Sequence, residues 1–265
     1  MTKIIAEIGW NHMGSISLAK KMILAAKKSG ADLVKTQIFD IKYLKPGPWM
    51  KDGRFEIYKK AQLTEKKYTE LLEFSKKNKI NFFTSVFNIL GAKQVLKVHN
   101  ELIKIPSTES RNIELIKFCT KNFKKIFIST GTSTKKEILK TKKIVKYRNS
   151  VFLHCVSSYP CDAKNANLPR INFIKTLAKE SGFSDHTLGT EVSKIALGYK
   201  IDYLEKHFTI DKSLPGRDNK FAILPHQLKD LVLFKKILNE CNKSLGSDYL
   251  KIETETRRKY TGRWG

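Results

Sequence analysis

The chain has 265 residues, 41% of them hydrophobic and 29% charged, which is enough to bury one sizeable core. No apolar run approaches the roughly 18 residues that cross a bilayer, and the first residues have the pattern of a strand rather than of a signal peptide, so we expect a cytoplasmic protein. The net charge of +26 comes from lysines spread along the predicted helices, which is typical of a solvated surface rather than of a nucleic-acid groove.

Short β-branched and aromatic runs alternate with helical patterns from the N-terminus onward. The first run, 3–8, ends in the loop signal Gly9–Gly14, and the helix that follows starts near Ser17 and stops at Gly30. Further strands are expected at 32–38, 80–86, 101–105, 124–129, 151–155, 181–184 and 202–208. Further helices are expected at 64–78, 90–98, 112–121, 168–178, 189–198 and 225–245.

Eight strand–helix alternations predict an α/β protein with a single-domain (β/α)8 TIM barrel. We expect the barrel to span residues 1–248 and a basic C-terminal tail to span 249–265. The alternative, an open doubly wound sheet, lacks support because the chain contains no Gly-x-Gly-x-x-Gly motif and no P-loop. The connection over residues 39–63 is long enough to be a lid or a binding loop.

Polar residues gather where the predicted strands end, and in a barrel these ends face one mouth. Lys35 and Lys104 lie there with several serines, and buried ammonium groups need an anion such as a phosphate or a carboxylate. His186 and His207 end neighbouring strands and indicate a divalent-metal site. We expect His154 to be structural or to support a site residue from behind, and His99 and His226 to be solvated, while the pattern leaves His12 undecided.

Four cysteines, Cys119, Cys155, Cys161 and Cys241, have no metal-type spacing, so we expect reduced thiols.

Several motifs in this order resemble those of the sialic acid synthase (N-acetylneuraminate synthase) family. They are Ala6–Gly14, Val34–Gln37, Lys104–Glu109, Ser129–Gly131, His154–Pro160, Gly182–Gly189, Glu205–Asp211 and Pro215–Asp218, and they cover nearly the whole chain. The resemblance implies a TIM barrel that condenses phosphoenolpyruvate with an open-chain N-acylated amino sugar of the N-acetylmannosamine type. The products would be a nine-carbon 2-keto acid, sialic acid, and phosphate.

Carried over motif by motif, the resemblance implies a role for each matching residue. His186 and His207 would hold Mn2+ or Mg2+. The residues expected to bind phosphoenolpyruvate are Lys35, Lys104, Ser107, Ser129, Ser157 and Ser184. Gln37, Tyr159 and Asp218 would bind the sugar, Glu7 would face it, and Glu109 would lie beside the reacting carbons. We expect Glu109, Glu7 and His207 to be the catalytic residues.

The sequence departs from the family in three places. Ser157 occupies a position where some members carry Asn or Thr, and Pro106 replaces a common Gly and stiffens the turn before Ser107. The printed chain stops after Arg257 and Arg258, where bacterial members usually continue into a small antifreeze-like domain. Such a domain would be dispensable, supplied by a separate chain, or unnecessary for a different acceptor.

Three functions are therefore weighed. The first is a metal-dependent sialic-acid-type synthase, which we expect to be a homodimer. The second has the same chemistry with another aldose, such as a deoxy-diacetamido sugar that leads to legionaminic- or pseudaminic-type acids. In both, the loop over residues 40–63 is expected to touch the acceptor, with Phe55 and Tyr58 as contacts or as packing aromatics. The third is a basic, non-catalytic protein that binds nucleic acid, which would need no lysine or histidine at strand ends.

Overall fold

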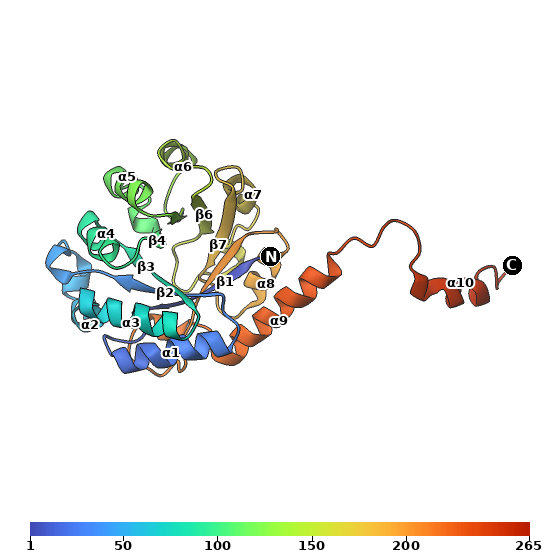
Figure 1. Cartoon of the computed structure of the whole chain (residues 1–265), viewed down its shortest axis with the longest axis horizontal. Helices are drawn as coiled ribbons and strands as arrows, with labels where there is room; N and C mark the ends of the chain where they lie inside the picture. The colour runs from blue at the N-terminus through green and yellow to red at the C-terminus, as the bar shows by residue number, and fades with distance from the viewer.

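A computed structural model describes all residues, 1–265, and contains one closed barrel of parallel strands in the order β1 to β8 (Figure 1). The strands are β1 (Lys3–Gly9), β2 (Leu33–Ile38), β3 (Asn81–Val86), β4 (Leu102–Ile105), β5 (Lys125–Ser129), β6 (Ser150–Cys155), β7 (Glu180–Asp185) and β8 (Tyr203–His207). Each strand pairs with its sequence neighbour, and β1 pairs with β8 to close the ring. The predicted TIM barrel is confirmed, and the open sheet is excluded.

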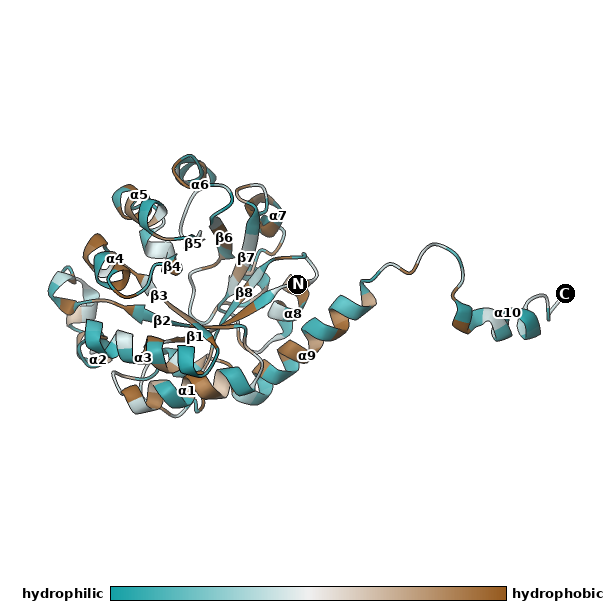
Figure 2. Ribbon diagram, viewed as in Figure 1, coloured by the Kyte–Doolittle hydropathy of each residue, from teal (hydrophilic) through white to brown (hydrophobic).

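Helices surround the barrel, and most lie where the sequence pattern places them. They are α1 (Ile16–Lys28), α3 (Glu65–Lys77), α4 (Ile89–Leu96), α5 (Ile113–Asn122), α6 (Lys135–Lys142), α7 (Arg170–Ile174), α8 (Glu191–Leu197) and α9 (Pro225–Cys241). Figure 2 shows hydrophilic and hydrophobic bands along these helices, which is the pattern of elements with one face on a core. The long helix predicted over 168–178 is wrong, because α7 covers only its middle.

Local sequence explains where several helices begin. Ser15, rather than Ser17, caps α1, and its hydroxyl accepts from the N–H of Leu18 at 3.3 Å. Thr134 and Glu137 form a reciprocal capping box at the start of α6. The loop over 39–63 also contains a helix that the sequence pattern missed, α2 (Arg54–Ala61).

The barrel interior is built in layers, because successive side chains of a strand point to opposite faces. An apolar layer fills the middle of the ring, and its members are Ile5, Leu33, Phe83, Phe127, Val151, Leu153 and Tyr203. The alternate residues pack outward against the helices in a larger cluster of 43 buried residues. The inward positions beyond the apolar layer, at the C-terminal strand ends, are polar.

The C-terminal segment extends away from the barrel after α9 and carries a short helix, α10 (Thr254–Tyr260) (Figure 1). All residues after Cys241 are exposed. None of the helices combines the length and apolar composition that a membrane crossing requires.

Candidate active site

A narrow polar cavity of about 50 Å3 lies at the C-terminal ends of the strands. Its lining comes from all eight strands and from the segments that follow β4, β6 and β7: Glu7, Lys35, Gln37, Ser85, Lys104, Pro106, Ser107, Ser129, Cys155, Tyr159, Ser184, His186, Glu205 and His207. The structure therefore brings together most of the residues that the sequence singled out. Glu109, Ser157 and Asp218 do not line this cavity.

Two ion pairs span the floor of the cavity. Nζ of Lys35 lies 2.6 Å from the carboxylate of Glu7, and Nζ of Lys104 lies 2.5 Å from that of Glu205. All four side chains are at most 5% exposed, so each charge depends on its partner. Lys35 also donates to the hydroxyl of Ser85 at 2.8 Å.

Strand alternation decides which strand-end residues reach the cavity. In β8, Glu205 and His207 point inward, whereas Lys206 points outward and pairs with Asp185 at 2.8 Å. Ser193 of α8 donates to the same carboxylate, so Lys206 and Asp185 tie the barrel to α8. The strand-end position of Lys206 and Asp185 does not make them site residues.

Burial and charge set the ionisation of the two glutamates differently. Burial raises the pKa of Glu7 to about 7 despite the neighbouring Lys35. Burial also acts to raise the pKa of Glu205, but Lys104 and Lys35 together hold it below its usual value. The pKa of Lys104 is lowered, first of all by burial. Glu205 is therefore the firm counter-ion of Lys104, and Glu7 is the group poised to exchange a proton near neutral pH.

Several hydroxyl groups belong to the cavity lining. The hydroxyls of Ser129 and Ser184 lie 3.2 Å apart, and Lys104 donates to Ser184 at 3.3 Å. The N–H of Gly131 donates to the hydroxyl of Ser107 at 3.1 Å. A Cβ on Gly131 would lie 2.3 Å from the hydroxyl oxygen of Ser157, so only glycine lets these two serines approach the loop.

The rings of His186 and His207 lie with their centroids 5.5 Å apart at the mouth of the cavity. Nδ1 of His186 is 2.8 Å from the carbonyl of Val156 and must carry a proton to donate there, which leaves Nε2 with its lone pair. Nδ1 of His207 is buried and makes no hydrogen bond. Burial, followed by the charge of His186, lowers the pKa of His207 well below its usual value and keeps it neutral.

The two imidazoles thus fit a divalent cation, since both can offer a lone pair to one ion. No group of three or more His, Cys, Asp and Glu side chains is arranged to hold a metal, so water and substrate oxygens would complete the ligand set. Burial acts to lower the pKa of His186, but the Cys155 thiol beside it raises that pKa overall.

Tyr159, Gln37 and Asp218 surround the histidine pair. The ring of Tyr159 lies over His186 at 4.1 Å between centroids, and Gln37 donates to Glu7 at 2.9 Å. Oδ2 of Asp218 lies 3.8 Å from Nδ1 of His207 and accepts a hydrogen bond from the indole N–H of Trp10.

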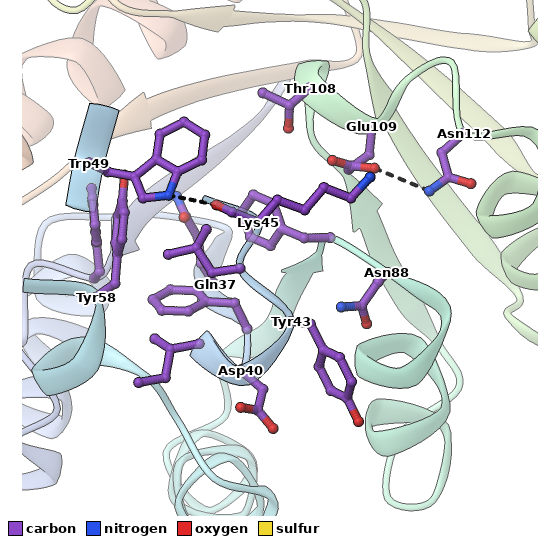
Figure 3. Close-up of a pocket in the computed structure, with 15 residues that line it drawn as sticks. Gln37, Asp40, Tyr43, Lys45, Trp49, Tyr58, Asn88, Thr108, Glu109 and Asn112 are labelled. Carbon is purple, nitrogen blue, oxygen red and sulfur yellow. Dashed lines mark hydrogen bonds between the residues drawn. The ribbon is translucent and has the colours of Figure 1, made fainter. Parts of the chain in front are cut away.

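A larger pocket of about 600 Å3 opens beside the polar cavity (Figure 3). Six of its 15 lining residues are aromatic, namely Trp10, Phe39, Tyr43, Trp49, Tyr58 and Phe87, and most of the others are polar. Glu109 lies here, half-buried, and accepts from Asn112 at 3.2 Å. Gln37 lines both spaces and joins them. We call the two spaces the polar cavity and the aromatic pocket.

Of the two aromatics expected from the loop, Tyr58 lines the aromatic pocket and Phe55 does not. Tyr58 belongs to α2, which brings its ring over Trp10 at 4.8 Å between centroids.

Three cavity residues were missing from the expected set: Ser85, Cys155 and Glu205. Strand alternation could have found them, because each lies two residues beyond an inward apolar position, namely Phe83, Leu153 and Tyr203. Cys155 is a buried free thiol whose sulfur lies 3.4 Å from the Ser107 hydroxyl. All four cysteines are free, as expected.

The remaining histidines serve the fold. His154 points out of the barrel and bonds the carbonyl of Ala166 at 2.7 Å, which confirms its structural role. His12 is fully buried, accepts from the N–H of Gly14 at 3.0 Å and lies 3.4 Å from the Thr36 hydroxyl. His226 is exposed on α9, as expected. The prediction for His99 is wrong, because it is half-buried after α4 and accepts from the N–H of Leu102 at 3.1 Å.

The geometry is that of a TIM-barrel enzyme whose strand ends carry a polar cavity with two imidazoles and an adjoining larger pocket. A sequence profile described as the NeuB family matches residues 22–248. The chain belongs to the NeuB family and is a phosphoenolpyruvate-dependent condensing synthase.

Individual relatives agree with this assignment. The N,N'-diacetyllegionaminic acid synthase of Legionella pneumophila is 34% identical over 97% of this chain and 79% of that protein. The N-acetylneuraminate-9-phosphate synthase of Drosophila melanogaster is 32% identical over 86% of this chain and 65% of that protein. The crystal structure of N-acetylneuraminic acid (sialic acid) synthetase from Leptospira borgpetersenii, in complex with citrate, superposes with a TM-score of 0.87 at 28% identity, covering 98% of this chain and 92% of that one.

Proposed function

We propose that this chain condenses phosphoenolpyruvate with an N-acylated amino-sugar aldehyde to give a nine-carbon 2-keto sugar acid and phosphate. One observation carries the proposal: two buried ammonium groups, a set of serine hydroxyls and two imidazoles line the same small cavity. Ammonium and hydroxyl donors suit the phosphate and carboxylate of phosphoenolpyruvate, and the imidazoles suit a cation beside an aldehyde oxygen.

In this proposal the polar cavity holds phosphoenolpyruvate. Lys35 and Lys104 neutralise its charge, and the hydroxyls of Ser107, Ser129 and Ser184 orient its oxygens, with Ser157 next to Gly131 outside the cavity lining. The cavity of about 50 Å3 is bordered by both ion pairs. An incoming anion therefore has to compete with Glu7 and Glu205 for the two ammonium groups.

The reaction forms one carbon–carbon bond and releases one phosphate. Mn2+ or Mg2+ held by His186 and His207 would supply Lewis-acid polarisation of the sugar aldehyde. The enol carbon of phosphoenolpyruvate attacks the aldehyde carbon, water adds to the cationic carbon that results, and phosphate leaves. The carboxylate of Glu109, on the aromatic-pocket side of Ser107, would stabilise that cationic carbon.

Glu7 is the group that we propose to take the proton of the attacking water. Burial raises its pKa to about 7, so a substantial fraction is ionised near neutral pH and can accept a proton. Gln37 donates to one oxygen of its carboxylate at 2.9 Å and orients it. Glu7 lies in the same cavity as the lysines and His207, where the water would add.

The aromatic pocket is proposed to hold the sugar, together with Gln37, Tyr159 and Asp218. Among the acceptors considered, we favour a deoxy-diacetamido aldose over N-acetylmannosamine. The aromatic rings of the pocket can bury the methyls of two acetamido groups, and its polar side chains can bond their amides. The two N,N'-diacetyllegionaminic acid synthases among the relatives, 34% and 33% identical, support the same choice.

Phosphate release from phosphoenolpyruvate in the presence of a panel of aldoses tests the function. We expect release with N-acylated amino sugars, fastest with a deoxy-diacetamido aldose, and none without an aldose. His186→Ala and His207→Ala should each lower the rate at least about 1,000-fold, since they remove metal ligands. The matched control His226→Ala changes an exposed histidine and should leave the rate unaltered.

EDTA treatment of the wild-type protein should abolish the rate, and added Mn2+ or Mg2+ should restore it. Full activity in the stripped protein would contradict the metal role, and no release with any aldose would contradict the function. The expected homodimer stays a prediction that light scattering in solution checks.

A further inference from the structure

Trp10 lies between the polar cavity and the aromatic pocket because β1 is irregular at its end. The pairing register of β1 with β2 shifts between Glu7 and Gly9, and Gly9 adopts a left-handed φ of +48°. Such an irregularity turns the chain and re-aims the next side chain. Trp10 follows directly and lines the aromatic pocket instead of continuing the strand.

The indole N–H of Trp10 donates to Oδ2 of Asp218. No other side chain or backbone group donates to this carboxylate, although Asp218 is only 7% exposed. The same Oδ2 lies 3.8 Å from Nδ1 of His207. Trp10 is thus the one hydrogen-bond donor that orients the carboxylate beside the histidine pair.

The backbone around Asp218 is held independently of Trp10. The side chain of Asn219 donates to the carbonyls of Pro215 at 2.8 Å and Asn11 at 3.3 Å, and it accepts from Thr209 at 2.5 Å. Removal of the indole N–H should therefore change the orientation of the carboxylate without releasing the loop that carries it.

The ring of Trp10 also contacts the long loop over residues 39–63. Tyr58 of α2 stacks on it at 4.8 Å with an interplanar angle of 13°, and Phe39 stands edge-on to both rings at 6.4 and 6.0 Å. Aromatic pairs of this kind stabilise a structure by more than the burial of their surface area accounts for. One side chain thereby connects the loop that forms the aromatic pocket with the carboxylate next to His207.

We propose that Trp10 is a positioning residue for the acceptor sugar, acting through Asp218. The indole fixes one carboxylate oxygen and leaves the other free for a hydroxyl or amide of the sugar, while its stack with Tyr58 holds the wall of the aromatic pocket. This inference rests on the proposed function, because it assigns the aromatic pocket to the acceptor.

Trp10→Phe keeps an aromatic ring for Tyr58 and removes only the indole N–H. We expect the KM for the acceptor to rise about 10-fold or more, as for the loss of a hydrogen bond to a charged group, and the KM for phosphoenolpyruvate to stay within about twofold. The matched control Trp264→Phe changes an indole that is 90% exposed on the C-terminal segment and should alter neither constant. Equal changes in both KM values for Trp10→Phe would overturn the proposal.

A double-mutant cycle with Asp218→Asn separates this route from a general effect on folding. If Trp10 acts through Asp218, then adding Trp10→Phe to the Asp218→Asn variant should raise the KM for the acceptor less than about twofold. An undiminished cost in that background would contradict the route.

The contact itself has a readout that needs no activity. In the variant Trp49→Phe/Trp264→Phe, Trp10 is the only tryptophan left of the three. Asp218→Asn should then shift its fluorescence emission maximum, whereas Asp248→Asn, on the exposed C-terminal segment, should not. An unchanged emission would refute the contact. Wild-type phosphate release tests the function separately, so the two failures are distinguishable.

Discussion

The two ends of the barrel both place lysine and glutamate side chains inside the ring of strands, but they bury them to different degrees. At the C-terminal end, the pairs Glu7–Lys35 and Lys104–Glu205 are at most 5% exposed. At the N-terminal end, Lys125 pairs with Glu180, and these side chains are 26% and 23% exposed. The apolar layer that contains Phe83 and Phe127 separates the two ends.

This difference in burial indicates that the ion pairs at the two ends of the barrel have different functions. A partly solvated pair such as Lys125–Glu180 costs little to form and stabilises little. Removing the two ions of a fully buried pair from water costs several kcal/mol per ion, which roughly cancels their mutual attraction. Apolar residues of similar size would therefore stabilise the fold equally well. The paired charges at the C-terminal end are therefore best explained by an anion that they receive.

The largest effect is expected for Lys104→Met, which removes one ammonium group of the polar cavity. It leaves the carboxylate of Glu205 buried without its partner, so we expect a loss of about 3–5 kcal/mol in the free energy of unfolding. Phosphate release should fall at least about 100-fold. Denaturant unfolding and the phosphate assay measure the two losses.

The double variant Lys104→Met/Glu205→Gln separates stability from function. It removes both charges, so most of the lost stability should return while phosphate release stays low. Recovery of activity in the double variant would show that Lys104 only neutralises Glu205 and takes no part in the reaction. The buried pairs at the C-terminal end would then not differ in function from the pair at the N-terminal end.

An intermediate effect is expected for His12, a buried group outside both sets of ion pairs. Burial lowers its pKa to about 4, below the usual 6.5, so the unfolded chain takes up a proton at a higher pH than the folded one. The unprotonated His12 therefore contributes its full stabilisation above pH 6.5. As the pH falls from 6.5 towards 4, the free energy of unfolding should decrease by about 3 kcal/mol on account of this residue.

Unfolding measured at several pH values checks the effect of His12. His12→Asn keeps an acceptor for the N–H of Gly14 but does not titrate, so its stability should fall less steeply between pH 6.5 and 4. The matched control His226→Asn, at an exposed position, should keep the wild-type slope. Parallel curves for His12→Asn and the wild type would refute the assignment.

The smallest effect is expected for Lys125→Met at the N-terminal end. The pair with Glu180 is partly solvated, so the free energy of unfolding should fall by about 1 kcal/mol or less. Phosphate release should stay within about twofold, since the apolar layer separates Lys125 from the polar cavity. A loss of activity like that of Lys104→Met would show that both ends serve the reaction.

Much of this organisation could be predicted from the sequence because each signal is local. Eight apolar runs with helical patterns between them predicted the barrel, and the strand-end position of Lys35, Lys104, His186 and His207 predicted their convergence. The ends of helices were harder to predict where the local sequence signals are weak. The helix α2 lies in a connection whose prolines and glycines at 46–48 and 53 are typical of a loop, and α7 ends at Ile174, well before the predicted position 178.

The rest of the site depends on facts that a strand-end rule leaves out. That rule does not say which of two adjacent residues points inward, so it does not separate Glu205 from Lys206. The resemblance implied that Glu109 lies beside the reacting carbons, and the turn at residues 107–109 carries this side chain into the aromatic pocket. Trp10 gained its role only through Asp218 and Tyr58, which lie 208 and 48 positions away in the chain.

The pairing of β1 with β8 has a consequence for how the enzyme becomes active. Glu7 and His207 are directly opposite each other across this seam, so the first and last strands each bring part of the machinery. A nascent chain that has not yet released β8 from the ribosome lacks a finished site, however well its earlier units have folded. The active site is thus completed in one step, when β8 pairs with β1.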